Sequence, residues 1–362
     1  MRFLAFALPA LAFAASLETG TVVKSDGGPL HRNTIPQVAR LGDGRLLCVF
    51  GAYAKDSGDG RIMGTISADG GRTWSTPRLL IDDPGKNDGD PNILVDGARV
   101  FVYGTRVNIP NRIDKAWTYV VRSEDNGATW SAPQEVQIPR QYTPGKQHNG
   151  IQLLDGTYAM GISWDLWAEK GMAARTEGEM VLASGLLKSI DGLRWTLHGS
   201  ITTFVPKQTP GSTNGLCEPS IVQFAGGSIL MLLRSGDSRH WQSRSEDSGV
   251  TWSHPEPSAL VGHNTPTALW RLEGPADEIV AVWNNSPVTR FPLTVAISSD
   301  KGETFSTPRI LANPIGYQVS YPGVTQTKDG TIVAVWQQQL PDGGRDIRFA
   351  RFSREWVLGS GQ

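Results

Sequence analysis

Short apolar runs of strand length, separated by tight turns, recur along the whole chain. At four places two such runs flank an Asp-Gly pair, at Asp43-Gly44, Asp96-Gly97, Asp155-Gly156 and Asp329-Gly330. Two further turns hold the equivalent places, Gly226-Gly227 and the segment from Glu273 to Asp277. Asp-Gly between alternating apolar runs favours a β-hairpin, because Gly accepts the positive φ that the turn requires. The pattern therefore predicts six hairpins, and no helical period of useful length lies between them.

A second repeat, with the pattern Ser-x-Asp-x-Gly-x-Thr followed by Trp or Phe, follows each of the first five hairpins. Its copies begin at Ser67, Ser123, Ser245 and Ser298, with a shortened copy at Ser189. Ser and Asp side chains can accept hydrogen bonds from backbone N–H groups inside such a turn, and Gly takes a conformation that a Cβ would disfavour. We therefore expect these boxes to be structural, with the aromatic residue packed under the turn or against a neighbouring sheet.

Repeats of about four short strands at this period predict an all-β fold, a six-bladed β-propeller in a single domain from about residue 17 to 355. The last blade, Val319 to Phe352, has no box after it. We expect a strand near Thr21 to Lys24 to complete it, which would remove an open sheet edge. The chain has only two cysteines. Cys48 and Cys217 fall in opposite blades of such a ring, so both are predicted to be free and mostly buried.

Composition fits this scaffold and excludes several classes of function. The chain has 41 Gly and 12 Trp in 362 residues, which suits many turns and aromatic packing. The net charge of −1 leaves no basic excess for nucleic acid. The sequence has no run of about 18 apolar residues, so no membrane span is predicted. No His/Cys/Asp cluster has metal-ligand spacing and no Gly-rich loop suits a phosphate, so neither a metal nor a cofactor is expected.

The N-terminal segment, residues 1–15, has the features of a secretory signal peptide. Arg2 is followed by the apolar stretch from Phe3 to Phe13 and by the small-x-small sequence Ala12-Phe13-Ala14, which suits cleavage. We therefore expect a secreted or periplasmic protein, and a monomer.

The Ser-x-Asp boxes resemble the Asp-boxes of the sialidase (neuraminidase) superfamily, and other segments extend the resemblance over nearly the whole mature chain. In chain order these segments are Thr34-Ile35-Pro36, His148-Asn149-Gly150, Cys217-Glu218-Pro219, Arg290-Phe291-Pro292 and Ser320-Tyr321-Pro322. The resemblance is closest to the divergent bacterial sialidase-like branch. It implies a six-bladed propeller with an acidic glycan as substrate.

The resemblance also implies a nucleophile and its base, Tyr321 and Glu218. A neutral phenol suits attack at an anomeric centre that bears a carboxylate, but a phenol needs a base beside it. The acid/base would be an aspartate in the loop from Gly51 to Arg61, where we prefer Asp59 to Asp56. The structural alternatives are a channel-lining tyrosine, a salt-bridged glutamate and solvated loop carboxylates.

Arginines are the third implied group, because two guanidinium groups that converge on one point can bind a carboxylate. Arg234 and Arg290 are matched to the second and third arginines of the family, with ion pairs between blades as the alternative. Thr34 stands where the family has its first arginine. Arg32 would project to the same strand face as Thr34, and Arg61 and Arg106 are further substitutes.

Three functions remain open on the sequence. The leading one is an exported, exo-acting glycoside hydrolase of sialidase type that cleaves a terminal acidic sugar, sialic acid or a related one. It requires Tyr321, Glu218, Arg234 and Arg290 to converge on one axial pocket. The second is a polysaccharide lyase or atypical glycosidase that uses His148 with a tyrosine on a uronic acid. The alternative role of His148 is a hydrogen bond in a turn. The third is a non-catalytic carbohydrate-binding propeller, which Thr34 favours.

Overall fold

The computed structural model describes residues 16–109, 116–140, 143–144, 148–166, 181–203, 205, 214–274 and 276–359. Strands account for most of these residues, so the all-β class expected from the sequence is confirmed. The expected signal peptide, residues 1–15, lies outside the described residues. No helix among the described residues is long and apolar enough to cross a membrane.

Successive strands pair into antiparallel units. The first two units contain β2 (Arg32–Arg40), β3 (Leu46–Tyr53), β4 (Gly60–Ser67) and β5 (Arg78–Ile81), then β6 (Lys86–Asp96), β7 (Arg99–Asn108), β8 (Ala116–Ser123) and β9 (Gln134–Val136). The next two contain β10 (Thr143–Pro144), β11 (Ile151–Gln152), β12 (Tyr158–Asp165), β13 (Val181–Ser189) and β14 (Thr196–Ile201), then β15 (Asn214–Gln223), β16 (Ile229–Ser235), β17 (Arg239–Ser245) and β18 (Glu256–Val261). The last two contain β19 (Ala268–Arg271), β20 (Ile279–Asn284), β21 (Leu293–Ser298) and β22 (Arg309–Ala312), then β23 (Val319–Gln326), β24 (Ile332–Gln339), β25 (Arg345–Phe352) and β1 (Glu18–Val23).

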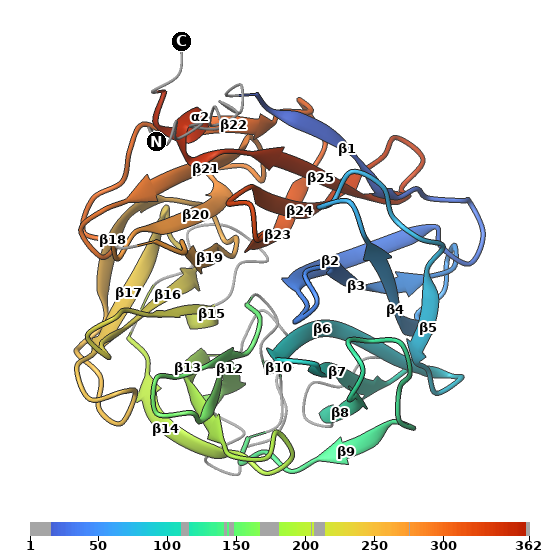
Figure 1. Ribbon diagram of the computed structural model, residues 1–362, viewed down its shortest axis with the longest axis horizontal. Helices are drawn as coiled ribbons and strands as arrows, with labels where there is room; N and C mark the ends of the chain where they lie inside the picture. The colour runs from blue at the N-terminus through green and yellow to red at the C-terminus, as the bar shows by residue number, and fades with distance from the viewer. Residues whose placement is uncertain are drawn as a thin grey trace, which may run out of the picture.

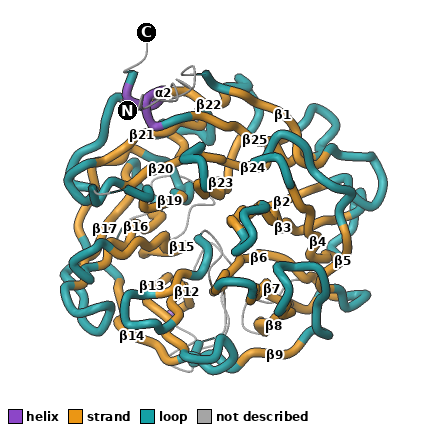
Figure 2. The backbone as a smooth tube through the Cα atoms, viewed as in Figure 1, coloured by secondary structure: helices purple, strands orange, loops and turns teal. Residues whose placement is uncertain are grey.

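These units stand around a common centre, toward which β2, β6, β15, β19 and β23 point (Figure 1). The predicted Asp-Gly hairpins are present between the first two strands of their units, with Gly44 at φ +97° and Gly330 at φ +89°. Loops connect the strands around the rim and close to the centre (Figure 2). The architecture thus brings the innermost strands of different units, which are far apart in sequence, to one place.

The two ends of the chain meet in one sheet. β1 pairs antiparallel with β25, with Thr21 opposite Arg348, as predicted, although β1 already begins at Glu18. A short helix, α2 (Arg354–Leu358), follows β25 and was not anticipated. The Ser353 side chain caps it by accepting a hydrogen bond from Trp356 N, and Trp356 packs against Phe352 at 5.5 Å between ring centroids.

The hydrophobic core lies between units. One cluster joins Leu47 and Val49 of β3 to Val100 and Val102 of β7, and further clusters join the other successive units in the same way. Another cluster contains Phe50 of β3 and Val335 of β24, so the first and last units also share a core. Cys48 and Cys217 are free and buried, which confirms that prediction.

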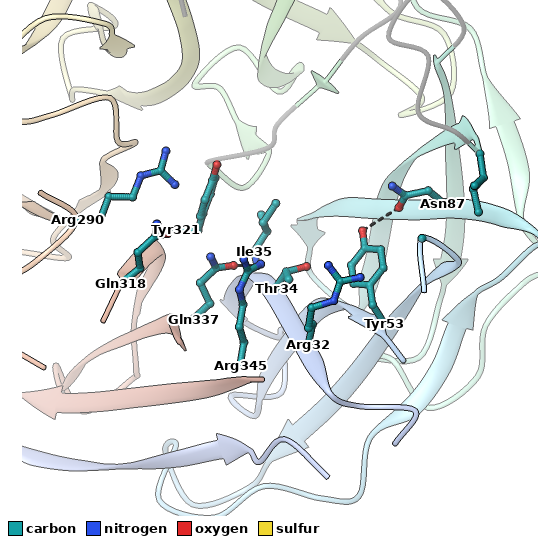
Figure 3. Close-up of a pocket in the computed structure, with 12 residues that line it drawn as sticks. Arg32, Thr34, Ile35, Tyr53, Asn87, Arg290, Gln318, Tyr321, Gln337 and Arg345 are labelled. Atoms are coloured by element: carbon teal, nitrogen blue, oxygen red, sulfur yellow. Dashed lines mark hydrogen bonds between the residues drawn. The ribbon is translucent and has the colours of Figure 1, made fainter. Parts of the chain in front are cut away.

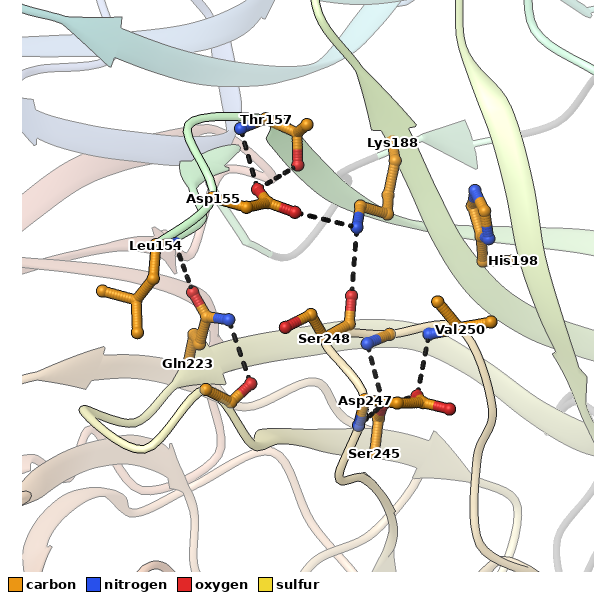
Figure 4. Close-up of polar contacts among 12 residues, drawn as sticks. Leu154, Asp155, Thr157, Lys188, His198, Gln223, Ser245, Asp247, Ser248 and Val250 are labelled. Atoms are coloured by element: carbon orange, nitrogen blue, oxygen red, sulfur yellow. Dashed lines mark hydrogen bonds and ion pairs between the residues drawn. The ribbon is translucent and has the colours of Figure 1, made fainter.

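The Ser-x-Asp boxes hold their turns as the sequence indicated. Asp247 Oδ1 accepts hydrogen bonds from Val250 N and Thr251 N at 3.0 and 2.8 Å, and Ser245 Oγ accepts one from Gly249 N at 2.7 Å (Figure 4). Bonds from the Thr251 hydroxyl and backbone lower the pKa of Asp247 to about 2. The Trp252 indole N–H donates to Gly249 O at 3.1 Å, so the ring closes under the turn.

A lysine connects one unit to the next at such a box. Lys188 Nζ donates to Asp155 Oδ2 at 3.4 Å, in the hairpin of its own unit, and to Ser248 O at 3.2 Å, in the box of the following unit (Figure 4). The boxes and hairpins therefore contribute to the scaffold.

Candidate active site

An unusual backbone conformation recurs in the innermost strands. Ile35, Asp90, Glu218 and Tyr321 all have positive φ, between +47° and +57°, and each directly precedes a proline. The strand registers shift at these same points, so each residue stands in a β-bulge. Positive φ costs an ordinary residue roughly 1–2 kcal/mol, and such strain is often kept where a bulge re-aims a functional side chain. Tyr321 and Glu218 therefore share the same backbone conformation at equivalent places of their strands.

This recurrence also points to Asp90, which the sequence reasoning did not single out. The x-Pro pairs at these four strands were visible in the sequence as a signal. Asp90 holds on β6 the place that Glu218 holds on β15 and Tyr321 on β23.

A cavity of about 540 Å³ opens beside Tyr321. Its lining comes mainly from the strands of the first, second, fifth and sixth units and the loops between them: Arg32, Thr34, Ile35, Tyr53, Gly58, Asn87, Ile109, Arg290, Gln318, Tyr321, Gln337 and Arg345. Figure 3 shows the arginines on more than one side of Tyr321. Among the described residues this lining contains three arginines and no carboxylate, which suits an anionic ligand.

Tyr321, Glu218 and Arg234 lie together, although of these three only Tyr321 is among the described residues that line the cavity. Arg234 Nη1 donates to Glu218 Oε2 at 2.7 Å and to Tyr321 Oη at 3.4 Å. The side chains of Arg234 and Glu218 are only 8% and 7% exposed. Burial disfavours the charged guanidinium, but the charges of Glu218 and Tyr321 outweigh burial and raise the pKa of Arg234 well above its usual value. Arg234 therefore remains a cation that bridges the two groups.

Arg290 joins this group through Asn264. Arg290 Nη2 donates to Asn264 O at 2.9 Å, and Arg234 Nε donates to Asn264 Oδ1 at 2.9 Å. The Arg290 guanidinium carbon lies 5.5 Å from the centroid of the Tyr321 ring. The four residues of the leading sequence hypothesis thus form one connected group, of which Tyr321 and Arg290 line the cavity.

Arg32 lines the cavity as expected, but beside an arginine that sequence reasoning missed. Arg345, the first residue of β25, is the parallel partner of Arg32 on β2. Thr34 also lines the cavity, and its hydroxyl donates to Gly51 O at 3.3 Å. Arg345 gave no local signal in the sequence, because only the pairing of the first and last units brings it here.

The two candidate acids flank Gly58 in the sequence; Gly58 lines the cavity, and neither aspartate is among its described lining residues. Asp56 is exposed, whereas Asp59 is half-buried and its Oδ2 accepts a hydrogen bond from Gly85 N at 3.1 Å. The structure therefore places the loop from Gly51 to Arg61 beside the site.

Arg61 and Arg106, the other candidates to replace the family's first arginine, lie outside the described lining of the cavity. Arg106 forms ion pairs with Asp88 at 2.7 Å and Asp83 at 3.1 Å, and stacks on the Tyr119 ring at 4.0 Å. Arg61 lies on β4 opposite Ala52 of β3. Neither is among the residues that line the cavity in the described chain.

His148 does not join the Tyr321 cluster. It is 4% exposed, and its Nδ1 lies 3.0 Å from Ser220 Oγ. Burial lowers the pKa of His148 to about 3, so the imidazole is neutral at ordinary pH. It lines a separate cavity of about 160 Å³ together with Ile221 and Trp270.

Comparisons with known proteins identify the family of the chain and solved structures with a similar fold. The BNR repeat-like domain model matches residues 44–334, and no curated protein matches the sequence. A Hadza microbial sialidase is 17% identical with a TM-score of 0.76, covering 94% of this chain and 69% of its own. A Dyadobacter fermentans protein of unknown function is 16% identical with a TM-score of 0.70, covering 92% and 99%.

A third solved structure is the Trypanosoma rangeli sialidase in complex with the inhibitor DANA. It is 15% identical with a TM-score of 0.72, and the match covers 96% of this chain but 61% of the trypanosomal one. At these identities the likeness shows a common fold.

Proposed function

The chain belongs to the family of BNR repeat-like domain proteins and has a sialidase-like fold, and on this basis we propose that it is a glycoside hydrolase that removes a terminal acidic sugar. Sialic acid or a related sugar is the proposed substrate, and the enzyme is exo-acting. The main support is the cavity beside Tyr321. Among the described residues, Arg32, Arg290 and Arg345 form no ion pair with a carboxylate, although all three line this cavity. Guanidinium groups in this state favour a ligand that brings its own acid group.

The proposed chemistry begins at Tyr321. Its phenol oxygen forms a bond to the anomeric carbon as the glycosidic C–O bond breaks, and the phenolic proton passes to Glu218. The positive charge of Arg234, 3.4 Å from Tyr321 Oη, stabilises negative charge as it develops on that oxygen. Asp59 is the candidate that protonates the leaving oxygen, and water then releases the sugar from the tyrosine.

The scaffold supports a six-bladed propeller in one domain, from about residue 17 to 355. Each antiparallel unit would be one blade, completed in the last case by β1. We further propose that the protein is exported after removal of residues 1–15 and acts as a monomer on glycans outside the cytoplasm.

A panel of aryl glycosides tests this function. The panel includes sialic acid and uronic acid glycosides, and the neutral glucose and galactose glycosides serve as controls. We expect turnover of an acidic glycoside alone, and a loss on the order of 10³-fold or more in Tyr321→Phe. Turnover that is unchanged in Tyr321→Phe would remove Tyr321 as the nucleophile. Products that absorb in the ultraviolet would instead indicate a lyase.

A second candidate function is carbohydrate binding without turnover. It is favoured by one observation, namely that the described lining of the cavity contains no carboxylate that could act as an acid. Binding of an acidic sugar by wild type, with no product from any glycoside in the panel, would support this function over hydrolysis.

A further inference from the structure

We propose that the cavity beside His148 is a second binding site, which takes a small neutral ring compound with a carbonyl oxygen, of the size of a monocyclic aromatic ketone. The site lies apart from Tyr321, and it does not depend on the glycoside hydrolase activity proposed above. The observation that carries the proposal is a buried nitrogen, His148 Nε2, which has no hydrogen-bond partner among the described residues. His148 itself lines the cavity and is only 4% exposed.

The cavity lies where the innermost strands of the third, fourth and fifth units continue beyond the Tyr321 cluster. β15 contributes its last three residues, Ile221, Val222 and Gln223, whereas Glu218 stands nearer its start. At about 3.3 Å per residue, the two places are roughly 10 Å apart along the strand. No described residue lines both this cavity and the one beside Tyr321. A ligand in one cavity therefore leaves the other free.

The walls of the cavity are largely apolar, and its size suits one six-membered ring. Ile151, Leu154, Ile221 and Val222 all line it. Ile221 is fully buried, whereas Leu154 in the neighbouring hairpin is 64% exposed, so the cavity opens to solvent on the side of Leu154 (Figure 4). The volume is about 160 Å³. An engineered apolar cavity of about 150 Å³ holds a benzene molecule, so a single ring fits here.

The polar side chains at the rim are already paired within the protein. Gln223 Oε1 accepts a hydrogen bond from Leu154 N at 2.8 Å, and Gln223 Nε2 donates to Gly227 O at 3.0 Å (Figure 4). Arg271 Nε donates to Asp277 Oδ1 at 2.9 Å, in an ion pair that balances its charge. The lining therefore favours a neutral ligand over a charged one.

The contacts of Ser220 determine which nitrogen of His148 carries the proton. Ser220 Oγ accepts a hydrogen bond from Leu269 N at 3.1 Å and lies 3.0 Å from His148 Nδ1. The structure describes no other acceptor for the Ser220 hydroxyl, so the hydroxyl donates to Nδ1. Burial lowers the pKa of His148 to about 3, so the ring is neutral and its one proton is on Nε2. His148 Nε2 is therefore a hydrogen-bond donor without a described partner.

Donors without acceptors define the chemistry of the ligand. Trp270 also lines the cavity, and its indole Nε1, likewise a donor, is buried without a described partner. A buried donor that lacks an acceptor is unfavourable, and a ligand oxygen relieves this. A carbonyl oxygen accepts without bringing a donor of its own. A sugar fits less well, because several of its hydroxyl groups would meet the apolar walls unpaired.

NMR titration of the full chain with acetophenone and with isopropylbenzene tests the proposal. The two probes have nearly the same shape, but only acetophenone has an acceptor oxygen. Wild type is expected to bind both. His148→Phe keeps an aromatic ring and loses the donor, so the ratio of the two affinities should shift toward isopropylbenzene by about 5- to 10-fold. Tyr321→Phe should bind both probes as wild type does, because Tyr321 lies in the other cavity.

A blocking variant keeps the test independent of whether His148→Phe folds. Gln152 lines the cavity and is exposed, so a larger side chain is tolerated there. The indole of Gln152→Trp should occupy the mouth and weaken binding of both probes by about 10-fold or more. Gln134→Trp is the matched control, because Gln134 is equally exposed on β9 and is not part of the described lining. It should bind both probes as wild type does.

Three outcomes would overturn the proposal. The first is a wild type that does not bind acetophenone. The second is a folded His148→Phe variant in which the ratio of the two affinities is unchanged. The third is a Gln152→Trp variant that binds both probes as tightly as the Gln134→Trp control.

Discussion

Arg234 Nη1 donates to Glu218 Oε2 across 2.7 Å, in a pair whose side chains are almost excluded from solvent. Such a pair contributes little net stability when intact, yet removing one partner leaves an unpaired buried charge. The pair therefore holds Glu218, the base of the proposed reaction, in place. A substitution of either residue should disturb the position of the other.

Removing Glu218 alone should destabilise the protein. Glu218→Ala is expected to lower the free energy of unfolding by about 3–5 kcal/mol, because Arg234 keeps its charge in a buried place. The double variant Glu218→Ala with Arg234→Met should recover a large part of this loss. Urea unfolding of the four proteins measures both effects, and strict additivity of the two substitutions would contradict the coupling.

The acid of the proposed reaction can be identified through leaving groups. Asp59→Asn should reduce turnover of a poor leaving group, such as an alkyl glycoside, by about 10²–10⁴-fold. It should reduce turnover of a 4-nitrophenyl glycoside far less, because that leaving group needs no proton. Asp56→Asn serves as the control from the same loop. If Asp90→Asn gives the selective loss and Asp59→Asn does not, the acid is Asp90.

His148 should make stability depend on pH on the acid side. The pKa of His148 is about 3 in the folded protein, below the ordinary value of 6.5. Between these two pH values the imidazole is protonated in the unfolded chain but not in the folded protein. Stability is therefore full above about pH 6.5 and falls as pH decreases toward 3, by on the order of 4 kcal/mol. Unfolding of wild type and His148→Gln between pH 7 and 4 checks this, and parallel curves would count against it.

The aspartate of a Ser-x-Asp box should affect the stability of the fold at lower pH than His148 does. The pKa of Asp247 is about 2 in the folded protein, below its ordinary value of 3.8, so this carboxylate contributes stability above about pH 4 that is lost as pH falls through 2. Asp247→Asn should be less stable than wild type at pH 7, and the difference should disappear near pH 2. Thermal melting across this range measures the difference, which would persist at pH 2 if shape rather than charge mattered.

The glycine of a box should not tolerate a side chain. Gly249 has φ +89°, and a Cβ there would lie 2.3 Å from Leu186 Cδ2. Gly249→Ala should cost about 2–4 kcal/mol through strain and overpacking. Gly226→Ala is the control, because its Cβ would meet no atom within 4 Å. Equal unfolding free energies for the two variants would show that the box turn adapts.

Features carried by local turn chemistry could be predicted from the sequence. The hairpins at Asp43-Gly44 and Asp329-Gly330 and the hydrogen bonds of the boxes follow from a few adjacent residues, so their positions were readable. The convergence of Tyr321 with Glu218 was also predicted, through resemblance to a family whose motifs carry it. The helix α2 has only five residues, which is too short to show a helical period.

The rest depended on contacts between distant parts of the chain. Arg345 reaches the site because its strand pairs with β2 at Arg32. Arg106 forms an ion pair with Asp88 instead. Neither contact can be predicted from the residues next to these arginines in the sequence. His148 belongs to a segment that resembles a site motif, yet Ser220 on β15 holds its ring in another cavity. Charge pairing across the fold thus decided which of several arginines remained available to a ligand.

The pairing of β1 with β25 has a consequence for how the protein is made. Glu18 meets Arg351 across 333 positions of the chain, so β1 is synthesised long before the strand with which it pairs. The last unit cannot acquire its outermost strand while the ribosome is still adding residues before β25. This unit is therefore complete only once β25 has been synthesised, and until then β1 is exposed to unwanted strand partners.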